Sequence, residues 1–211
     1  MSKIGHITAT ALTAVLLICA TVTAPHAQSR NPAVIGQDQY LQGQFSMDRH
    51  LAGFDKPLTS GGEFTLSPAT GLIWHTITPF PGMTVLDDHG ITRIDDQDNR
   101  ETLADGDQFR PFIELISAVL AGNWDPLRER FDIVQQTAKG NDPWQIVLTP
   151  KGGSPIAGQI STITATGTQF VDDVQIAKPS GDRDAITLSG QELHDMPLPT
   201  DLADIFAGPV N

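Results

Sequence analysis

The side chains best able to act as bases or metal ligands are His75, His89 and His194, which lie far apart in the sequence. His75 alternates within an expected strand, His89 lies in an expected turn, and His194 lies in a polar C-terminal stretch. The sequence contains no Gly-x-Ser-x-Gly or His-Glu-x-x-His motif, no phosphate-binding loop and no Gly-x-Gly-x-x-Gly motif. We therefore expect no catalytic residue, no metal site and no cofactor, and a protein that is not an enzyme.

The carboxylates are also poorly placed for catalysis. Asp87 and Asp88 are neighbours in the sequence, as are Asp172 and Asp173, so each pair points to opposite faces of an expected strand. Acid–base chemistry needs groups that converge on one point. Residues 95–99 (DDQDN) partly resemble a calcium-binding loop, but they lack its glycine at the sixth position and its glutamate at the twelfth. We interpret this stretch as the solvated end of a hairpin.

The more informative feature is an apolar helix. Apolar residues recur at helical spacing over residues 111–121, Pro111 suits the first turn, and Gly122 follows as a stop signal. Aromatic residues make up only 6% of the chain, so few large side chains are available to fill space around this helix. A sheet curved around it could leave a hydrophobic pocket, and an ordinary packed core is the alternative that the pattern leaves open.

Strands must position this helix, and period-two alternation of apolar and polar residues predicts many of them from Tyr40 onward. In residues 72–78, for example, Leu72, Trp74 and Thr76 share one face. Further strands are expected over residues 83–87, 90–95, 131–135, 144–149, 159–165, 169–176 and 185–189, with a second short helix over 125–130. The pattern therefore predicts a mainly β protein with inserted helices, an α+β fold, in one domain.

The first 27 residues have the order of a secretory signal peptide. Lys3 is followed by an apolar run and then by a cleavage region of small residues that ends at Ala27. The run is short and rich in threonine for a membrane span of about 20 residues, although an uncleaved anchor is the alternative. We expect cleavage, then a flexible lead-in or a short frayed helix over residues 28–39, and a single domain over residues 40–211.

Cysteine and charge narrow the class of protein further. The only cysteine, Cys19, follows Ile18 inside the apolar run, whereas lipid attachment requires a small residue just before the cysteine. Cleavage would therefore release a domain that has no lipid anchor, no disulfide and no thiol nucleophile. The formal net charge is −12, and no basic cluster offers contacts to phosphate groups, so nucleic acid is not an expected partner.

Several stretches resemble, in order, the LolA-type carriers of outer-membrane lipoproteins. No single motif is diagnostic, but their order and spacing agree with that family over roughly residues 40 to 190, and the block over residues 45–61 suggests a divergent branch. The matching stretches are residues 62–66 (GEFTL), 71–79 (GLIWHTITP), 84–91 (TVLDDHGI), 111–116 (PFIELI) and 144–151 (WQIVLTPK), followed by 160–163, 167–174 and 186–188.

The resemblance implies an unclosed antiparallel β-barrel wrapped around a short apolar helical lid, here residues 111–121. In that family, a cavity beneath the lid holds the acyl chains of a lipoprotein. The soluble carrier takes them through the periplasm, from an inner-membrane donor complex to an outer-membrane acceptor. Alternation and the motif matches together predict a cavity lined by Phe64, Leu66, Leu72, Trp74, Met83, Val85, Phe112, Ile113, Ile116 and Leu120.

One departure from the family concerns an arginine. The best-known carriers have an arginine six residues before the strand tryptophan, where it helps to control opening, and this chain has Pro68 there. Arg49 and Arg110 are the candidates to replace it. Because the family's arginine is missing, we expect the cargo to be either a lipoprotein or another lipid. A module that senses lipoproteins and acts through a protein partner is the alternative function, while an enzyme acting on a lipid or a glycan has no assembled site to support it.

Overall fold

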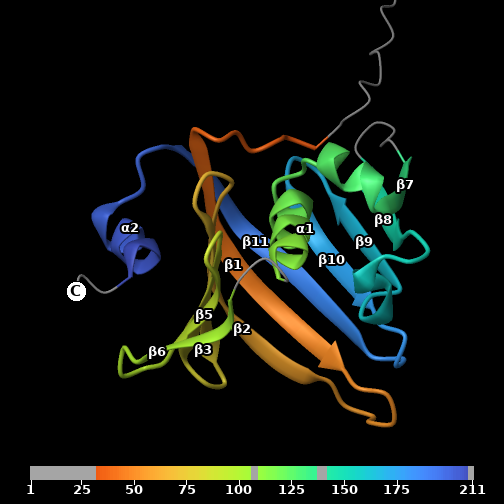
Figure 1. The fold of residues 1–211 in the computed structure, drawn as a ribbon, viewed down its shortest axis with the longest axis horizontal. Helices are drawn as coiled ribbons and strands as arrows, with labels where there is room; N and C mark the ends of the chain where they lie inside the picture. The colour runs from red at the N-terminus through yellow and green to blue at the C-terminus, as the bar shows by residue number, and fades with distance from the viewer. Residues whose placement is uncertain (1–31, 106–108, 137–141, 209–211) are drawn as a thin grey trace, which may run out of the picture.

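The computed structural model describes residues 32–105, 109–136 and 142–208, so the expected signal peptide lies outside the described residues. These residues form one 11-stranded sheet in which every neighbouring pair is antiparallel (Figure 1). The strands are β1 (Gln39–His50), β2 (Leu58–Ser67), β3 (Gly71–Thr78), β4 (Gly82–Asp87), β5 (Gly90–Ile94), β6 (Arg100–Asp105), β7 (Phe131–Gln136), β8 (Trp144–Pro150), β9 (Thr162–Gly167), β10 (Val171–Ala177) and β11 (Arg183–Asp195).

The order of the strands shows that the sheet is not closed. It runs β6-β5-β4-β3-β2-β1-β11-β10-β9-β8-β7, so β6 and β7 form its two edges within the described part of the chain. The long strands β1 and β11 pair at the middle of the sheet and join its two halves. The predicted fold class, a mainly β protein built as an unclosed antiparallel barrel with inserted helices, is confirmed.

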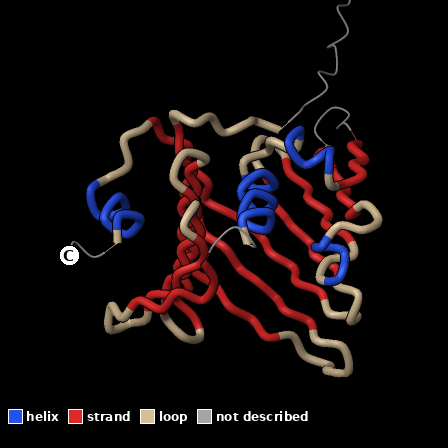
Figure 2. The backbone as a smooth tube through the Cα atoms, in the orientation of Figure 1, coloured by secondary structure: helices blue, strands red, loops and turns tan. Residues whose placement is uncertain are grey.

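Two α-helices lie against opposite faces of this sheet. The helix α1 (Arg110–Leu120) lies in the angle between the half formed by β8–β11 and the half formed by β2–β6, whereas α2 (Thr200–Ala207) lies outside it (Figures 1 and 2). The predicted helix over residues 111–121 is thus confirmed. The second predicted helix is a 3₁₀ turn, η1 (Asp125–Glu129), and another such turn, η2 (Pro155–Gly158), precedes β9.

The start and the end of α1 follow from its sequence. Proline lacks a backbone donor, and the first turn of a helix has no partner for one, so Pro111 is accommodated there. At the other end, Gly122 adopts a φ of 69°, a left-handed conformation that favours glycine. The Gly122 backbone N–H then donates to the carbonyl of Val119 at 3.2 Å. The helix therefore ends where the sequence predicted.

The main hydrophobic core lies between α1 and the inner face of the sheet. Leu115 of α1 is fully buried, and Val119 is nearly so. Trp124 and Trp144 pack with their ring centroids 5.3 Å apart at the β8–β9 side of this core. A smaller cluster on the outer face brings α2 onto the strands, and its buried members are Ile73, Val85 and Ile94. Both faces of β3 and β4 are therefore covered.

The expected flexible lead-in is instead packed over its described part, residues 32–38. The backbone N–H of Ala33 donates to the carbonyl of Gln169 at 2.7 Å, and that of Ile35 donates to the carbonyl of Ala121 at 3.0 Å. The Ile35 side chain is buried in the main core. Weak periodicity in the sequence did not reveal this segment because its one buried side chain and its backbone hydrogen bonds depend on distant parts of the chain, the end of α1 and the turn between β9 and β10.

Candidate functional site: an apolar cavity beneath α1

An apolar cavity of about 330 Å³ lies between α1 and the inner face of the sheet. Strands from both halves of the sheet contribute to it, which brings together residues more than 100 positions apart in the sequence. Among the lining residues, only Arg49, Thr84 and Asp184 are polar or charged. The apolar residues that line it are Met47, Leu72, Trp74, Leu86, Phe112, Ile116, Val119, Leu120, Ile163, Val174, Ile176 and Ile186.

The pairing of the strands explains which side chains face the cavity. Leu72 pairs with Leu86 and Trp74 pairs with Thr84, and directly paired residues project to the same face of an antiparallel sheet. The ring of Trp74 stacks on that of Phe45 in β1, with centroids 3.8 Å apart. This contact fixes one face of the indole and leaves the rest of the ring as part of the cavity wall.

Five of the ten side chains predicted for the cavity do line it. They come from one strand and from the lid helix: Leu72, Trp74, Phe112, Ile116 and Leu120. Leu72 and Leu120 are almost fully buried and form the wall, whereas Trp74, Phe112 and Ile116 are only partly buried. The partly buried members are therefore the side chains most accessible to a ligand.

Met83 and Val85 do not line the cavity, and their predicted orientation is wrong. Val85 pairs with Ile73, and Met83 pairs with His75, so both project to the outer face of the sheet. There they pack in the small cluster beneath α2. Alternation identifies which residues share a face but not which face is inside, and a helix on the outer face makes that face apolar too.

The other three predicted side chains do not line the cavity either. Leu66 is fully buried within the main core. Phe64 is buried beside Gly43, where an added Cβ would lie only 2.7 Å from its ring. Ile113 lines a separate pocket of about 470 Å³, which also contains Pro68 and Arg110. Of the two candidates to replace the family's arginine, Arg110 therefore lies near Pro68, while Arg49 lines the apolar cavity.

An ion-pair cluster forms around the buried carboxylate of Asp184 at one end of the cavity. The Nε of Arg49 donates to Asp184 Oδ1 at 2.8 Å, and the Nζ of Lys178 lies 2.9 Å from Asp184 Oδ2. Only 8% of the Asp184 side chain is exposed. Burial alone would raise the pKa of this carboxyl, but the hydrogen bonds and positive charges of Arg49 and Lys178 outweigh it and hold the pKa below its usual value. Asp184 is therefore charged at neutral pH.

This lowered pKa predicts a pH-dependent stability. A carboxyl whose pKa is lower in the folded state stabilises the fold fully above its unfolded pKa of about 3.9, and this contribution is lost as the pH falls through the folded value. We expect Asp184→Asn to reduce the free energy of unfolding by about 1–3 kcal/mol at pH 7, and by progressively less below about pH 4. Urea unfolding of both proteins from pH 7 to pH 3 measures the difference.

The exposed Asp173 on neighbouring β10 provides the matched control for that experiment, since its substitution also removes one carboxylate. Asp173→Asn should change the free energy of unfolding by less than about 0.5 kcal/mol at either pH. A penalty for Asp184→Asn that stays constant down to pH 3 would contradict the assignment of a lowered pKa.

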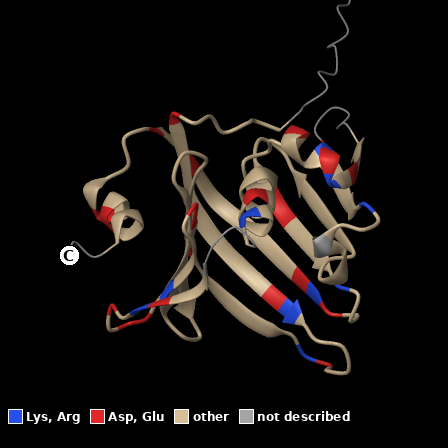
Figure 3. Ribbon diagram, in the orientation of Figure 1, with Lys and Arg blue, Asp and Glu red and all other residues tan. Residues whose placement is uncertain are grey.

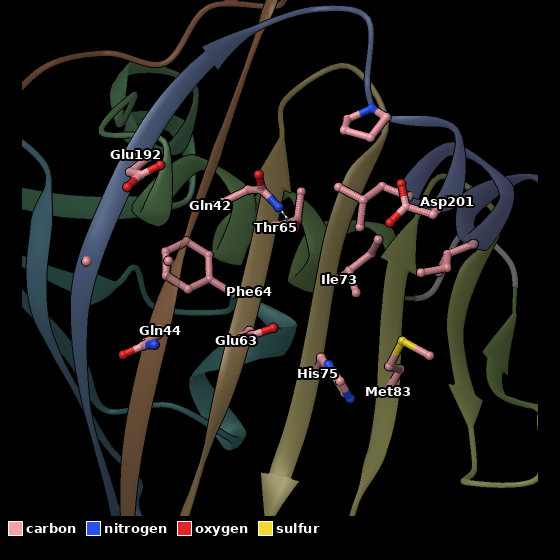
Figure 4. Close-up of a pocket in the computed structure, with 15 residues that line it drawn as sticks. Gln42, Gln44, Glu63, Phe64, Thr65, Ile73, His75, Met83, Glu192 and Asp201 are labelled. Carbon is pink, nitrogen blue, oxygen red and sulfur yellow. Dashed lines mark hydrogen bonds between the residues drawn. The ribbon is translucent and has the colours of Figure 1, made fainter.

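A second, more polar groove lies on the outer face between the sheet and α2 (Figure 4). Its volume is about 550 Å³, larger than that of the apolar cavity. Figure 4 shows side chains of mixed character along it, including the carboxylates of Glu63, Glu192 and Asp201 and the ring of His75. We regard the smaller cavity as the candidate site because its lining has a consistent chemical character, which this groove lacks.

The structure does not bring the three candidate histidines together. His75 lines the outer groove, and His194 stacks on Tyr40 with ring centroids 5.0 Å apart. His89 lies in the exposed turn between β4 and β5, where its ligand atoms and those of Asp87 and Asp88 lie within 4.8 Å of one another. This is a group of potential metal ligands among the described residues, but Asp87 Oδ1 already accepts the backbone N–H groups that shape the turn.

The stretch that partly resembled a calcium-binding loop closes a hairpin between β5 and β6. Asp95 Oδ1 accepts the backbone N–H groups of Gln97 at 2.8 Å and Asn99 at 2.9 Å, and Asp95 Oδ2 accepts the Asn99 side-chain amide at 2.9 Å. These hydrogen bonds lower the pKa of the Asp95 carboxyl, and the bond from the Asn99 side chain has the largest effect. Its oxygens are therefore used in shaping the turn.

The fold and the site together define a class of protein: an open antiparallel sheet that encloses an apolar cavity beneath a helix. Within the described part of the chain, no helix is both long enough and apolar enough to cross a membrane. No protein-family model matches the sequence, and no curated protein sequence matches it either.

Several solved structures are similar to this chain. A LolA superfamily protein from Nitrosomonas europaea has a TM-score of 0.40 at 8% identity, with 78% of this chain and 90% of that chain covered. A putative outer-membrane lipoprotein-sorting protein domain from Vibrio parahaemolyticus has a TM-score of 0.39 at 8% identity, with coverages of 79% and 89%. A chain of the MucA/MucB complex from Pseudomonas aeruginosa has a TM-score of 0.43 at 14% identity, with coverages of 79% and 56%.

These similarities carry no argument about what this chain binds. Its function is therefore inferred from the cavity.

Proposed function

We propose that this protein is a non-enzymatic carrier that shelters an acyl chain of a lipoprotein or another lipid in the cavity beneath α1. The observation that carries this proposal is the nearly continuous apolar lining, contributed by the lid helix and by both halves of the sheet. A site for a polar metabolite would instead need several convergent polar groups. Here the polar groups are confined to Thr84 and the Arg49–Asp184 pair.

The free energy of hydration supports an acyl ligand. Each methylene group moved from water into an apolar environment contributes about 0.8 kcal/mol, so a chain of ten methylenes gains several kcal/mol from a dry cavity. Small-molecule sites typically enclose about 300–1,000 Å³. At about 330 Å³ the cavity is at the lower end of this range, so it suits part or all of a single acyl chain in its present form.

The helix α1 is the element best placed to act as a lid. Its buried side, which includes Leu115 and Val119, packs in the core, while Phe112 and Ile116 face the cavity and are only partly buried. A salt bridge from Arg130 Nη2 to Glu114 Oε2 at 2.7 Å links the outer side of the helix to the segment before β7. A small movement of α1 would widen the cavity to admit a larger cargo.

The signal peptide expected over residues 1–27 supports a periplasmic location for this carrier. A periplasmic location suits a protein that diffuses between two membranes. By resemblance to the LolA-type carriers, an inner-membrane complex would supply the cargo and an outer-membrane protein would receive it.

Recovery of bound lipid tests the proposal directly. The full chain, with its own leader, is expressed in a Gram-negative host and purified from the periplasm without detergent. We expect native mass spectrometry to show a protein–lipid complex, lipid extraction to yield an acyl-containing molecule, and a fluorescent fatty acid to bind the delipidated protein. Repeated recovery without any such ligand, together with no binding of the fatty acid, would overturn the proposal.

A further inference from the structure

The cluster of Arg49, Asp184 and Lys178 gives one end of the apolar cavity a positive charge. Arg49 and Asp184 line the cavity directly, and Lys178 lies against the same carboxylate. Two cations share the Asp184 carboxylate, so these three residues carry a net charge of about +1 at neutral pH, and the nearby Asp182 carboxylate also interacts with Lys178. This contrasts with the formal net charge of −12 for the whole chain. Figure 3 shows basic and acidic positions close together where the end of β1 meets the start of β11.

The cluster also has unused capacity to bind an anion. A guanidinium carries five N–H donors, and here the Nε and one Nη nitrogen of Arg49 contact Asp184, at 2.8 and 3.4 Å. The other terminal nitrogen, Nη1, has no hydrogen-bond partner among the described residues, and 43% of the Arg49 side chain is exposed. Lys178 is 28% exposed and has three donors, so both cations can reach a ligand while they hold Asp184.

A purely structural role accounts for only part of this arrangement. Arg49 and Asp184 are direct partners in the pairing of β1 with β11, and such cross-strand pairs stabilise sheets. One cation is enough to neutralise the buried carboxylate. The second cation, Lys178 from the segment after β10, brings a charge beyond the one that neutralises Asp184, and it also lies near the Asp182 carboxylate. Its placement beside an apolar cavity suits a ligand with an apolar chain and a negatively charged end.

We propose that the lipid bound in the cavity carries an anionic headgroup, a carboxylate or a phosphate, which Arg49 and Lys178 hold at the end of the cavity. This inference rests on the proposed function, because the apolar chain of the same molecule would occupy the space beneath α1. Asp184 acts as a positioning residue, since its bond to Nε keeps the guanidinium oriented. Charge-assisted bonds of this kind are about twice as strong as neutral ones.

Displacement of the neutral fluorescent probe N-phenyl-1-naphthylamine from the delipidated protein tests the inference. The competitors share a twelve-carbon chain and differ in their headgroup: dodecanoate, dodecyl phosphate and the neutral ester glycerol monododecanoate. We expect one or both anions to displace the probe at about tenfold lower concentration than the neutral ester, which corresponds to about 1.4 kcal/mol. The stronger of the two identifies the source of the anion as a carboxylate or a phosphate.

Two variants remove the positive charge without leaving Asp184 unpaired. Lys178→Gln keeps the Arg49–Asp184 pair, and the triple variant Arg49→Gln/Lys178→Gln/Asp184→Asn removes every charge of the cluster. In both, we expect the preference for the anions to fall to about twofold or less, while the affinity for the neutral ester stays within about twofold of the wild type. Lys151→Gln, which removes an exposed lysine near η2, is the matched control and should keep the full preference.

Each outcome decides a separate question. Equal binding of the anions and the neutral ester to the wild type would overturn the headgroup site and leave the carrier proposal intact. An unchanged preference in Lys178→Gln would overturn the role of that lysine, and an unchanged preference in the triple variant would overturn the site as a whole. If none of the three amphiphiles displaces the probe from the wild type, the proposed function fails, and this inference fails with it.

Discussion

Substitution of Ile116 by tryptophan is expected to weaken binding of a fluorescent fatty acid more than tenfold. The Ile116 side chain projects from α1 into the cavity, where an indole would occupy space that we assign to the acyl chain. Exclusion of only two methylene groups from the cavity would cost about 1.6 kcal/mol, which already exceeds a factor of ten in affinity. The larger ring has open volume to enter, so the free energy of unfolding should fall by less than about 1.5 kcal/mol. Fluorescence titration and urea unfolding measure the two effects separately.

The matched control is Ile113→Trp, the same substitution one turn earlier on the same helix. Ile113 is also partly buried, but it lines the neighbouring pocket with Pro68 and Arg110. We expect this variant to bind the fatty acid within about twofold of the wild type. Wild-type affinity in a folded Ile116→Trp protein, or an equal loss in both variants, would show that the cavity beneath α1 is not the acyl site.

The helical side of this site could be predicted from the sequence alone. The 3.6-residue spacing over residues 111–121 identified the apolar face that carries Phe112 and Ile116, and Pro111 and Gly122 fixed its ends. Ile113 was misplaced because a broad apolar face on a short helix contacts the core, the cavity and a side pocket at once. Periodicity gives the direction of a side chain but not the shape of its surroundings.

The strand side was predicted less well because the sequence did not reveal α2. The helix α2 is only eight residues long, and its side chains Leu202, Ile205 and Phe206 cover Ile73 and its neighbours on the outer face. With both faces of β3 and β4 apolar, alternation could not show which face was inner. The match to the family hairpin then favoured Val85, whereas Thr84 and Leu86 line the cavity.

The charged end of the cavity could not be predicted from local patterns. Arg49 and Asp184 are 135 residues apart, and they meet only because β1 pairs with β11 in a particular register. Each is an ordinary polar residue in an alternating strand. Strand β6 was missed for a related reason, since Leu103 is exposed and the strand is at an edge of the sheet. Such features depend on tertiary pairing, which the period of one segment does not encode.

Substitution of Trp144 by alanine is expected to lower the free energy of unfolding by about 3–5 kcal/mol, the usual range for a fully buried aromatic residue. Trp144 is fully buried, its ring packs against Trp124, and its Nε1 donates to the carbonyl of Thr168 at 3.0 Å. Alanine would leave a cavity and an unpaired carbonyl. Urea unfolding gives the loss, and Trp144→Phe, which keeps a ring but no donor, should lose about half as much.

Substitution of Trp74 by alanine tests whether this side chain belongs to the cavity wall or to the packed core. Trp74 is only partly buried and stacks on Phe45 with one face towards the cavity, so Trp74→Ala should cost about 1–2 kcal/mol of stability. It should nevertheless weaken fatty-acid binding more than Trp144→Ala does at a temperature where both variants are folded. A larger stability loss at Trp74 with no binding defect would mean that this tryptophan belongs to the packed core. A cavity that binds lipid requires the opposite result, because a partly buried side chain that contacts the ligand contributes more to binding than to folding.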